Sequence, residues 1–350
     1  MPTLRLSKAT GYKPQATSHK KKPETGSLKP PPARWRAGVA CKIGITLGDA
    51  AGIGPEVILK ALDDKEVKKL GARFLIIGDK KVIENNSHKL NIPLPKQANI
   101  LDLSNINYKF RAGRVDRELG RAAVEYIEKG VQLAQKKKID ALVTAPVNKE
   151  AMNLAGYDYP GHTQLLAELT EVKDVAMMFG SSFFNVVLVT THLPLREVSS
   201  LLTKQRVYKT IKLSNDFFKK YFRKKARIGV AGFNPHAGEK GLFGSEEKEI
   251  EKAVKKARQE GMKIEGPLPA DVLFHQAYSK KYEVVIAMYH DQGLVPFKML
   301  AFDKGVNITL GLPIIRTSPD HGTAFDIAGK GIANPGSMVE AIKMAEFLSQ

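Results

Sequence analysis

Three histidines in the sequence each come after an apolar run that has the length of a buried strand. His192 follows residues 186–191, His236 lies just beyond residues 228–233, and His290 follows residues 284–289. In open parallel sheets, ligands gather at the carboxyl ends of strands, and neutral imidazole binds zinc, cobalt and nickel ions well. Three protein ligands with an open position are typical of a catalytic metal site. A single histidine at a strand end is usually structural, so the hypothesis of one shared divalent cation depends on the convergence of all three.

A second group of side chains is suited to bind an anion. Residues 161–163, Gly-His-Thr, stand just before an apolar helical segment at 165–169, and backbone amides at a helix start can hold a phosphate. Arg316 lies beside Thr317 and Ser318, which together would make a clamp for phosphate or carboxylate. Either Lys298 or Arg316 alone could be a surface charge, but their apolar surroundings, punctuated by Gly and Pro, favour binding. The predicted anion-binding set is His162, Thr163, Lys298, Asn307 and Arg316.

Two glycine-rich stretches could bring their backbone close to a ligand. Residues 48–56 have the order strand, Gly-rich turn and helix, but the spacing is not G-x-G-x-x-G and the Walker lysine is missing. A tight structural turn and a ligand loop therefore both remain open there. Residues 321–335 are dense in glycine and small residues, and Asp326 among them could hold a ribose hydroxyl, although such loops are also ordinary connections.

The elements that would position these residues alternate between strands and helices. Strands are predicted at 43–46, 74–78, 139–145, 185–191, 227–233 and 283–289, and helices from Pro55 onward and at 114–136, 208–222 and 246–259. This alternation is typical of an α/β fold, with a mostly parallel sheet and helices on both faces.

Composition narrows the class of protein. The chain has 350 residues, enough for two packed lobes, and no apolar run approaches the ~20 residues of a membrane-spanning helix. Cys41 is the single cysteine, which excludes an internal disulfide framework and favours a reducing, cytoplasmic setting. A catalytic thiol is not favoured, because Cys41 simply precedes a predicted strand.

The net charge of +19 suggests nucleic acid, but its distribution weakens that interpretation. Residues 1–38 carry nine Lys or Arg and one acid, Glu24, so this stretch supplies +8 and leaves +11 for the rest. The stretch has no periodicity and is predicted to be a disordered tail. It could be a loose tail, or the result of a translation start placed too far upstream; an organelle transit peptide is the less favoured alternative. The remaining positive charge, for example at residues 219–225, indicates a solvent-exposed basic face. Such a face would also attract anionic substrates.

Seven motifs occur together in the order of one enzyme family. They are Gly-Asp-Ala-Ala-Gly-Ile-Gly-Pro-Glu at 48–56, Thr-Ala-Pro-Val-Asn-Lys at 144–149, Gly-His-Thr at 161–163, Thr-His-Leu at 191–193, Asn-Pro-His-Ala-Gly-Glu at 234–239, Tyr-His-Asp-Gln-Gly at 289–293 and Asp-His-Gly-Thr-Ala at 320–324. From about Lys42 to its end, the chain resembles the 4-hydroxythreonine-4-phosphate dehydrogenase family. Ala50, where the family usually has proline, and the basic tail depart from its pattern.

The resemblance implies a fold and an assembly. The expected fold is a two-lobed α/β/α architecture with mostly parallel sheets, similar to isopropylmalate and isocitrate dehydrogenases, in a homodimer whose active sites lie in the cleft between lobes near the dimer interface. The expected division is a basic tail at 1–38, a cofactor-side lobe at 39–150 and 306–350, and a metal- and dimer-side lobe at 151–305.

The resemblance also implies roles for individual residues. The implied metal ligands are His192, His236 and His290, for one divalent ion such as Zn, Mg or Co. The anion-binding set named above would hold the substrate, and Asp271 and Lys298 are the candidates for the general base. His321, Gly322, Asp326 and Asn334 would bind NAD or NADP.

The implied reaction is NAD-dependent oxidation of 4-phosphohydroxy-L-threonine at its 3-hydroxyl, followed by decarboxylation to 3-amino-2-oxopropyl phosphate in pyridoxine 5'-phosphate (vitamin B6) synthesis. Relatives in the family oxidise phosphorylated threonate or erythronate, which the cationic set also suits, or an aromatic cis-dihydrodiol carboxylate, which it does not. Two other classes of protein fit the sequence less well. A nucleic-acid-binding protein lacks support, because aromatic residues do not interleave with the basic clusters. A phosphate-acetyltransferase-like enzyme would share the two-lobed architecture but would need no histidine-bound metal.

Overall fold

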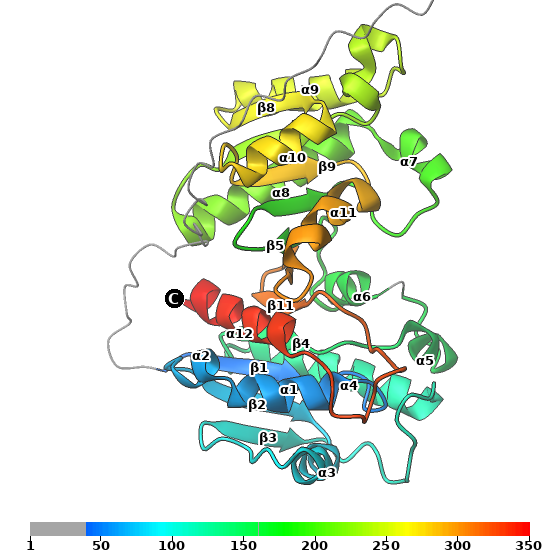
Figure 1. The fold of residues 1–350 in the computed structure, drawn as a ribbon, viewed down its shortest axis with the longest axis vertical. Coiled ribbons are helices and arrows are strands. Elements are labelled where there is room, and N and C mark those ends of the chain that lie inside the picture. Colours follow the sequence, from blue (N-terminus) through cyan, green and yellow to red (C-terminus); the bar gives the residue numbers. More distant parts are fainter. Residues whose placement is uncertain (1–39, 160) are drawn as a thin grey trace, which may run out of the picture.

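The structure, a computed structural model, describes residues 40–159 and 161–350, so the predicted tail at 1–38 lies outside the described residues. One sheet of eleven strands runs through the described chain, in the order β3-β2-β1-β4-β11-β10-β5-β6-β9-β7-β8 (Figure 1). The strands are β1 Lys42–Thr46, β2 Arg73–Gly78, β3 Ala98–Asp102, β4 Ala141–Thr144, β5 Ala176–Gly180, β6 Asn185–Leu188, β7 Arg227–Ala231, β8 Lys263–Leu268, β9 Val284–Ala287, β10 Val306–Leu310 and β11 Arg316–Pro319.

Helices connect most of these strands. They are α1 Gly54–Asp63, α2 Lys65–Lys68, α3 Lys80–Leu90, α4 Arg117–Gln135, α5 Lys149–Leu154, α6 His162–Leu169, α7 Leu195–Leu201, α8 Lys204–Phe222, the short 3₁₀ segment η1 Pro235–Gly241, α9 Glu247–Gln259, α10 Ala270–Tyr278, α11 His290–Ala301 and α12 Gly336–Ser349. The predicted α/β class with a mostly parallel sheet is confirmed.

Antiparallel pairing occurs only in the middle of the described sheet. β10 pairs antiparallel with both β11 and β5, and β5 pairs antiparallel with β6, whereas the other strand pairs are parallel. The resemblance implies two lobes with mostly parallel sheets, and in the structure the β10–β5 pair joins the two parallel halves into one continuous sheet. In Figure 1 this seam lies between the half that carries α1 to α4 and the half that carries α8 to α10.

Helix α4 shows how the sequence forms these elements. The Asp116 side chain caps the helix by accepting hydrogen bonds from the backbone N–H groups of Glu118 and Leu119. Leu119, Ile127 and Val131 are buried on one face, as their helical spacing predicts. The helix begins three residues later than predicted because Asp116 occupies the cap.

Several elements were not predicted from the sequence. β11 has the polar sequence Arg-Thr-Ser-Pro and yet all four residues are buried, and β8 contains both Gly and Pro. Two predicted strands, at 139–145 and 185–191, are shorter in the structure and end at Thr144 and Leu188. The residues just beyond these strand ends, including Pro146 and His192, leave the sheet and line a cavity.

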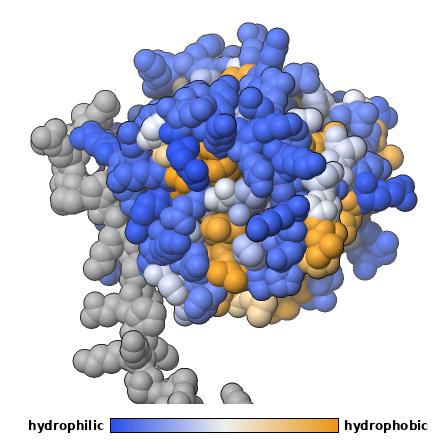
Figure 2. Space-filling view, turned by 90° about the horizontal axis from the view of Figure 1, so that it is seen from above, coloured by the Kyte–Doolittle hydropathy of each residue, from blue (hydrophilic) through white to orange (hydrophobic). Residues whose placement is uncertain are grey.

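The surface carries many charged and hydrophilic side chains, as the composition of the sequence predicts. Figure 2, seen from the end that carries α9 and β8, shows a mostly hydrophilic face interrupted by separate hydrophobic patches. The basic residues at the end of α8, Lys219, Lys220, Arg223, Lys224 and Lys225, are all exposed. Among the described residues, no helix is both long and apolar enough to cross a membrane.

Candidate active site

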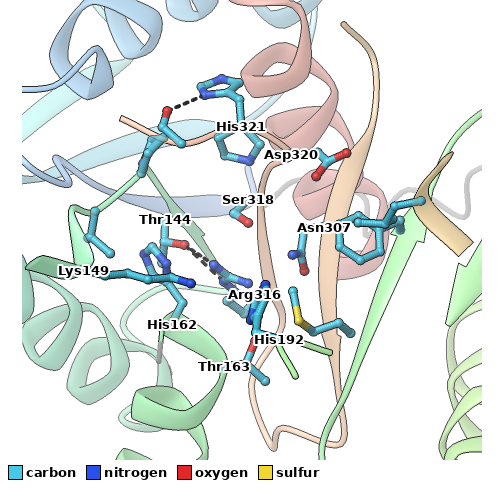
Figure 3. A pocket seen from close by; sticks show the side chains of 18 of the residues that line it. Thr144, Lys149, His162, Thr163, His192, Asn307, Arg316, Ser318, Asp320 and His321 are labelled. Atoms are coloured by element: carbon cyan, nitrogen blue, oxygen red, sulfur yellow. Dashed lines mark hydrogen bonds between the residues drawn. The ribbon is translucent and has the colours of Figure 1, made fainter. Parts of the chain in front are cut away.

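A cavity of about 300 Å³ lies beside the antiparallel seam of the sheet. Its lining comes from the ends of β4 and β11, from β5 and β10, from the starts of α5 and α6, from α11 and from the loop after β11. Figure 3 shows these side chains pointing toward one space from elements that are far apart in sequence. The five predicted anion-binding residues, His162, Thr163, Lys298, Asn307 and Arg316, all line this cavity.

Arg316 is the first residue of β11 and is 2% exposed. Its Nε and Nη2 donate to Thr144 Oγ1 at 3.1 and 2.7 Å, and its Nη1 donates to Thr309 Oγ1 at 3.0 Å. Burial lowers the pKa of Arg316 to about 9, and no carboxylate among the described residues offsets this effect. The guanidinium remains charged at neutral pH, so the site holds a buried positive charge with hydroxyl partners only.

His162 lies next to this charge at the first position of α6. Burial, and then the nearby Arg316 charge, hold the pKa of His162 well below its ordinary value. The imidazole is therefore neutral at pH 7, and its buried Nε2 has no hydrogen-bond partner among the described residues. Thr163, the next residue, is also buried at the cavity wall.

Two of the three predicted metal ligands come together in the same cavity. The rings of His192 and His290 have centroids 5.6 Å apart. Partial burial, the charge of Lys149 and the neighbouring His290 lower the pKa of His192, which keeps its lone pair available. Nδ1 of His290 lies 2.7 Å from Oδ1 of Asp291, a contact that orients the ring and leaves Nε2 for another partner.

His236 and Asp271 do not line the cavity. His236 is exposed in η1, where residues 236–240 have positive φ, and its ring centroid lies 6.2 Å from that of Phe243. Asp271 is exposed in the first turn of α10, an element that contacts η1. The two residues therefore belong to neighbouring elements outside this cavity. Within 40–159 and 161–350, no three His, Cys, Asp or Glu residues are arranged to hold a metal ion.

Lys298 projects from α11 toward a buried carboxylate. Its Nζ lies 3.6 Å from Oδ1 of Asp320, and the Asp320 side chain is only 8% exposed. Burial raises the pKa of Asp320 to about 6, while Lys298 opposes that rise. The pair places the Lys298 amino group at the cavity wall.

The four predicted cofactor residues lie on one loop but in different surroundings. His321 and Gly322 line the cavity, and a Cβ placed on Gly322 would meet no atom within 4 Å, so its backbone is open to close approach. Asp326 and Asn334 are exposed and do not line the cavity. Oδ1 of Asn334 accepts a hydrogen bond from the backbone N–H of Gly336 at 2.8 Å.

Sequence reasoning gave no role to three residues that the structure places at the cavity. Thr144 holds the Arg316 guanidinium, Lys149 adds a cation, and Asp320 faces Lys298. All three belong to motifs quoted above, at 144–149 and 320–324. The position of Thr144 at a strand end was the available signal, because cavity residues in this fold cluster there.

Comparison with known proteins decides the family. A sequence profile described as "Pyridoxal phosphate biosynthetic protein PdxA" matches residues 69–345. The 4-hydroxythreonine-4-phosphate dehydrogenase of Desulforapulum autotrophicum is 47% identical over 320 residues, which cover 87% of this chain and 94% of the relative. The chain belongs to the PdxA family. The D-threonate 4-phosphate dehydrogenase of Cupriavidus necator is 45% identical, over 88% of this chain and 97% of the relative.

A solved structure of the PdxA family has the same architecture. The crystal structure of 4-hydroxythreonine-4-phosphate dehydrogenase from Klebsiella pneumoniae matches with a TM-score of 0.80 and 39% identity, covering 89% of this chain and all of that one. The chain is accordingly a PdxA-type dehydrogenase, an oxidoreductase.

The cavity of this PdxA-family chain is where unmet polar groups concentrate. Eight buried side-chain atoms among the described residues have no hydrogen-bond partner, and four of them belong to cavity residues: His162, Asn307, Asp320 and His321. Buried polar atoms without partners are costly, so their clustering indicates a place where ligand or water completes the bonding.

Proposed function

We propose that this chain oxidises the 3-hydroxyl of 4-phosphohydroxy-L-threonine with NAD or NADP as hydride acceptor. The observation that carries the proposal is the buried guanidinium of Arg316, which has hydroxyl partners but no carboxylate among the described residues. A phosphate would supply the missing negative charge, since Arg binds phosphate bidentately. Lys298, Asn307, His162 and Thr163 line the same cavity and would hold the rest of the substrate.

The donor set at the cavity suits a divalent cation when a second copy of the chain contributes to it. His192 and His290 supply two neutral imidazoles on one side. His236 and Asp271 lie on the neighbouring elements η1 and α10, so a homodimer could present both to the partner's cavity. Exposed apolar side chains beside them, Leu242, Phe243 and Val272, would suit such an interface.

The nicotinamide cofactor is proposed to lie along the loop after β11. Gly322 offers open backbone at the cavity, and Asp326 is exposed further along the same loop, where it could accept a ribose hydroxyl. This assignment gives the lobe at 39–150 and 306–350 the cofactor side and the lobe at 151–305 the metal and dimer side. The single cysteine supports the proposal of a reducing compartment such as the cytoplasm.

When bound, a divalent cation would supply Lewis acidity at the alcohol, and the nicotinamide would accept the hydride. The chain's own residues have two tasks. Arg316 and His162 fix the phosphate end and thereby orient the C3 hydrogen. Asp271, or Lys298 as the neutral amine beside Asp320, is the proposed group that takes the hydroxyl proton. The C3 hydrogen leaves with its electron pair, and the resulting β-keto acid releases carbon dioxide and takes up a proton at C2 to give 3-amino-2-oxopropyl phosphate.

A second substrate is supported by the comparisons. The relative from C. necator, which is named for D-threonate 4-phosphate, is nearly as similar as the one named for 4-hydroxythreonine-4-phosphate. The two substrates differ at C2, where one has an amine and the other a hydroxyl. The phosphate anchor at Arg316 serves both.

NADH formation tests the proposal. The purified chain is assayed with 4-phosphohydroxy-L-threonine and with 4-phospho-D-threonate, each with and without a chelator. We expect chelator-sensitive turnover of one or both. Turnover of neither substrate, with metal and either dinucleotide supplied, would overturn the proposed function, and the ratio of kcat/KM values decides between the substrates.

A further inference from the structure

The loop after β11 contacts α1, together with the turn just before this helix, at two places. Near the start of the loop, the carbonyl of Thr323 accepts a hydrogen bond from the backbone N–H of Ile53 at 3.0 Å. Gly52 packs so closely there that a Cβ would lie 2.9 Å from Cβ of Thr323. Asp326, the proposed ribose-binding residue, lies between this contact and the second one.

The second contact is an ion pair on α1. Nζ of Lys60 lies 2.7 Å from Oε1 of Glu56, one helical turn earlier, and the Glu56 side chain is 3% exposed. Oε1 of Glu56 accepts from the backbone N–H of Ala333 at 2.7 Å, and Oε2 accepts from that of Gly331 at 3.2 Å. Nζ of Lys60 donates to the carbonyls of the same two residues, Gly331 and Ala333, at 2.9 Å each.

Stabilisation of helix α1 alone does not explain why the Glu56–Lys60 pair is buried. An exposed Glu–Lys pair one turn apart contributes only a few tenths of a kcal/mol, and burying the charges costs more than that. Here the two charges instead satisfy the N–H and C=O groups of two loop residues at once. Because hydrogen bonds to charged groups are the strong ones, the pair fixes the backbone at 331–333 in one conformation.

We propose that the Glu56–Lys60 pair is a positioning device for the dinucleotide cofactor. It holds the loop 323–333 in its binding conformation before the cofactor arrives, and so sets the affinity for the dinucleotide without touching it. The inference rests on the proposed role of this loop in binding the cofactor. A segment ordered in advance loses less conformational entropy on binding, which is why removal of the pair weakens binding of NADH.

The test compares Glu56→Gln with the wild-type chain. Dissociation constants for NADH are measured by fluorescence titration, and KM is measured separately for the dinucleotide and for the phosphorylated substrate. We expect at least about a tenfold rise in the Kd for NADH and in the KM for the dinucleotide, since one charged hydrogen-bond set is lost. KM for the phosphorylated substrate, and kcat at saturating dinucleotide, should stay within about twofold.

Two further variants make the result specific. Lys60→Met keeps the Glu56 acceptors but loses the bonds to the two carbonyls, and should weaken NADH binding in the same direction. As a control, Glu340→Gln breaks a more exposed Glu–Lys pair on α12, where Lys343 Nζ lies 2.8 Å from Glu340 Oε1, and should leave NADH binding unchanged. The inference would be overturned if the wild-type chain and a folded Glu56→Gln variant bound NADH equally well. It would also be overturned if the KM for the phosphorylated substrate rose as much as the KM for the dinucleotide.

Amide hydrogen exchange of the wild-type chain covers the case in which the variants fail to fold. The amides of Gly331 and Ala333 should be protected before NADH is added. Protection that appears only with NADH would also overturn the inference. If the wild-type chain binds neither NADH nor NADPH, the proposed function fails instead, so the two failures are distinguishable.

Discussion

Arg316 shows how a single residue determines the chemistry of this cavity. A buried guanidinium without a carboxylate partner is expensive, and its three hydrogen bonds to threonine hydroxyls compensate it only in part. Sequence reasoning weighed Arg316 as a surface charge against a binding residue, and its 2% exposure excludes the surface interpretation. The remaining positive charge favours an anion as the ligand of this cavity.

The hydroxyl of Thr144 should matter for substrate binding although it need not touch the substrate. Thr144→Val removes two of the hydrogen bonds that orient Arg316 and should lower kcat/KM for the phosphorylated substrate by about 10- to 100-fold. Thr170→Val is the control, because Thr170 is also a buried threonine but its hydroxyl bonds to the Leu166 carbonyl within α6 and its C-cap. Steady-state kinetics that show equal losses in both variants would contradict this role for Thr144.

Asp49 lies in the glycine-rich turn before α1, and its burial should make the stability of the protein depend on pH. The residue is fully buried, and burial raises its pKa to about 6. A folded-state pKa above the unfolded value means that Asp49 destabilises the fold as pH rises from about 4 through about 6. Asp49→Asn, whose Oδ1 can still accept from the N–H of Ala51, should therefore be more stable than wild type by roughly 1–3 kcal/mol at pH 8.

Thermal or denaturant unfolding at several pH values checks the prediction for Asp49. The gain should disappear near pH 4, where the wild-type carboxyl is protonated. A stability difference that is constant across this range would show that the ionised carboxylate is not the cause.

At the scale of elements, the sequence predicted the parallel strands and amphipathic helices well and the seam poorly. β1, β2, β7 and β9 are near-continuous apolar runs, which is typical of strands buried on both faces. β11 is buried as well, but its sequence, Arg-Thr-Ser-Pro, gives no apolar signal. Arg316, Ser318 and Pro319 line a polar cavity, and the Thr317 hydroxyl donates to the Ala341 carbonyl of α12, so tertiary context decides the conformation of β11.

The residues that line the candidate site were predicted from the sequence only in part. The anion-binding residues and two imidazoles were predicted from types and motifs, and they meet in the cavity. The positions of His236 and Asp271 outside it could not be predicted, because convergence of residues far apart in sequence depends on topology and assembly. Thr144 was passed over because a strand-end threonine is common, whereas its contact with Arg316 becomes visible only in three dimensions.

The contact between α4 and α5 predicts a glycine requirement. A Cβ on Gly120 would collide with the backbone of Ala151, which cannot move without shifting α5 and the cavity residue Lys149 at its start. Gly120→Ala should therefore lower the free energy of unfolding by roughly 2–4 kcal/mol. On the same helix, a Cβ on Gly130 would lie 2.7 Å from the Cδ1 methyl of Leu142, a side-chain end that can turn.

Gly130→Ala is thus the matched control, and its helix-propensity gain should keep the change within about 1 kcal/mol. Urea denaturation of the two variants measures the difference. Equal destabilisation by both substitutions would mean that the α4–α5 contact adapts and does not constrain the site.

For the whole molecule, the proposed homodimer predicts complementation between inactive variants. His192→Ala and His236→Ala should each abolish turnover. In a mixed dimer, however, one site receives both substitutions and the other receives neither, if His236 acts in the partner's cavity. Refolding an equal mixture should then restore roughly a quarter of the wild-type activity. No recovery, in a mixture shown to exchange subunits, would mean that both histidines serve the same chain.

The most direct test of the account concerns the phosphate anchor at Arg316. NADH formation from 4-phosphohydroxy-L-threonine, or from 4-phospho-D-threonate if that is the better substrate, is compared between the wild-type chain and Arg316→Met. Met has a similar length and removes the buried charge, so the variant should remain folded. The account predicts a fall in kcat/KM of about a thousandfold or more, because the phosphate loses its charged, oriented partner. An unchanged kcat/KM in the folded variant would contradict the assignment of this cavity as the site that binds and oxidises the phosphorylated hydroxy acid.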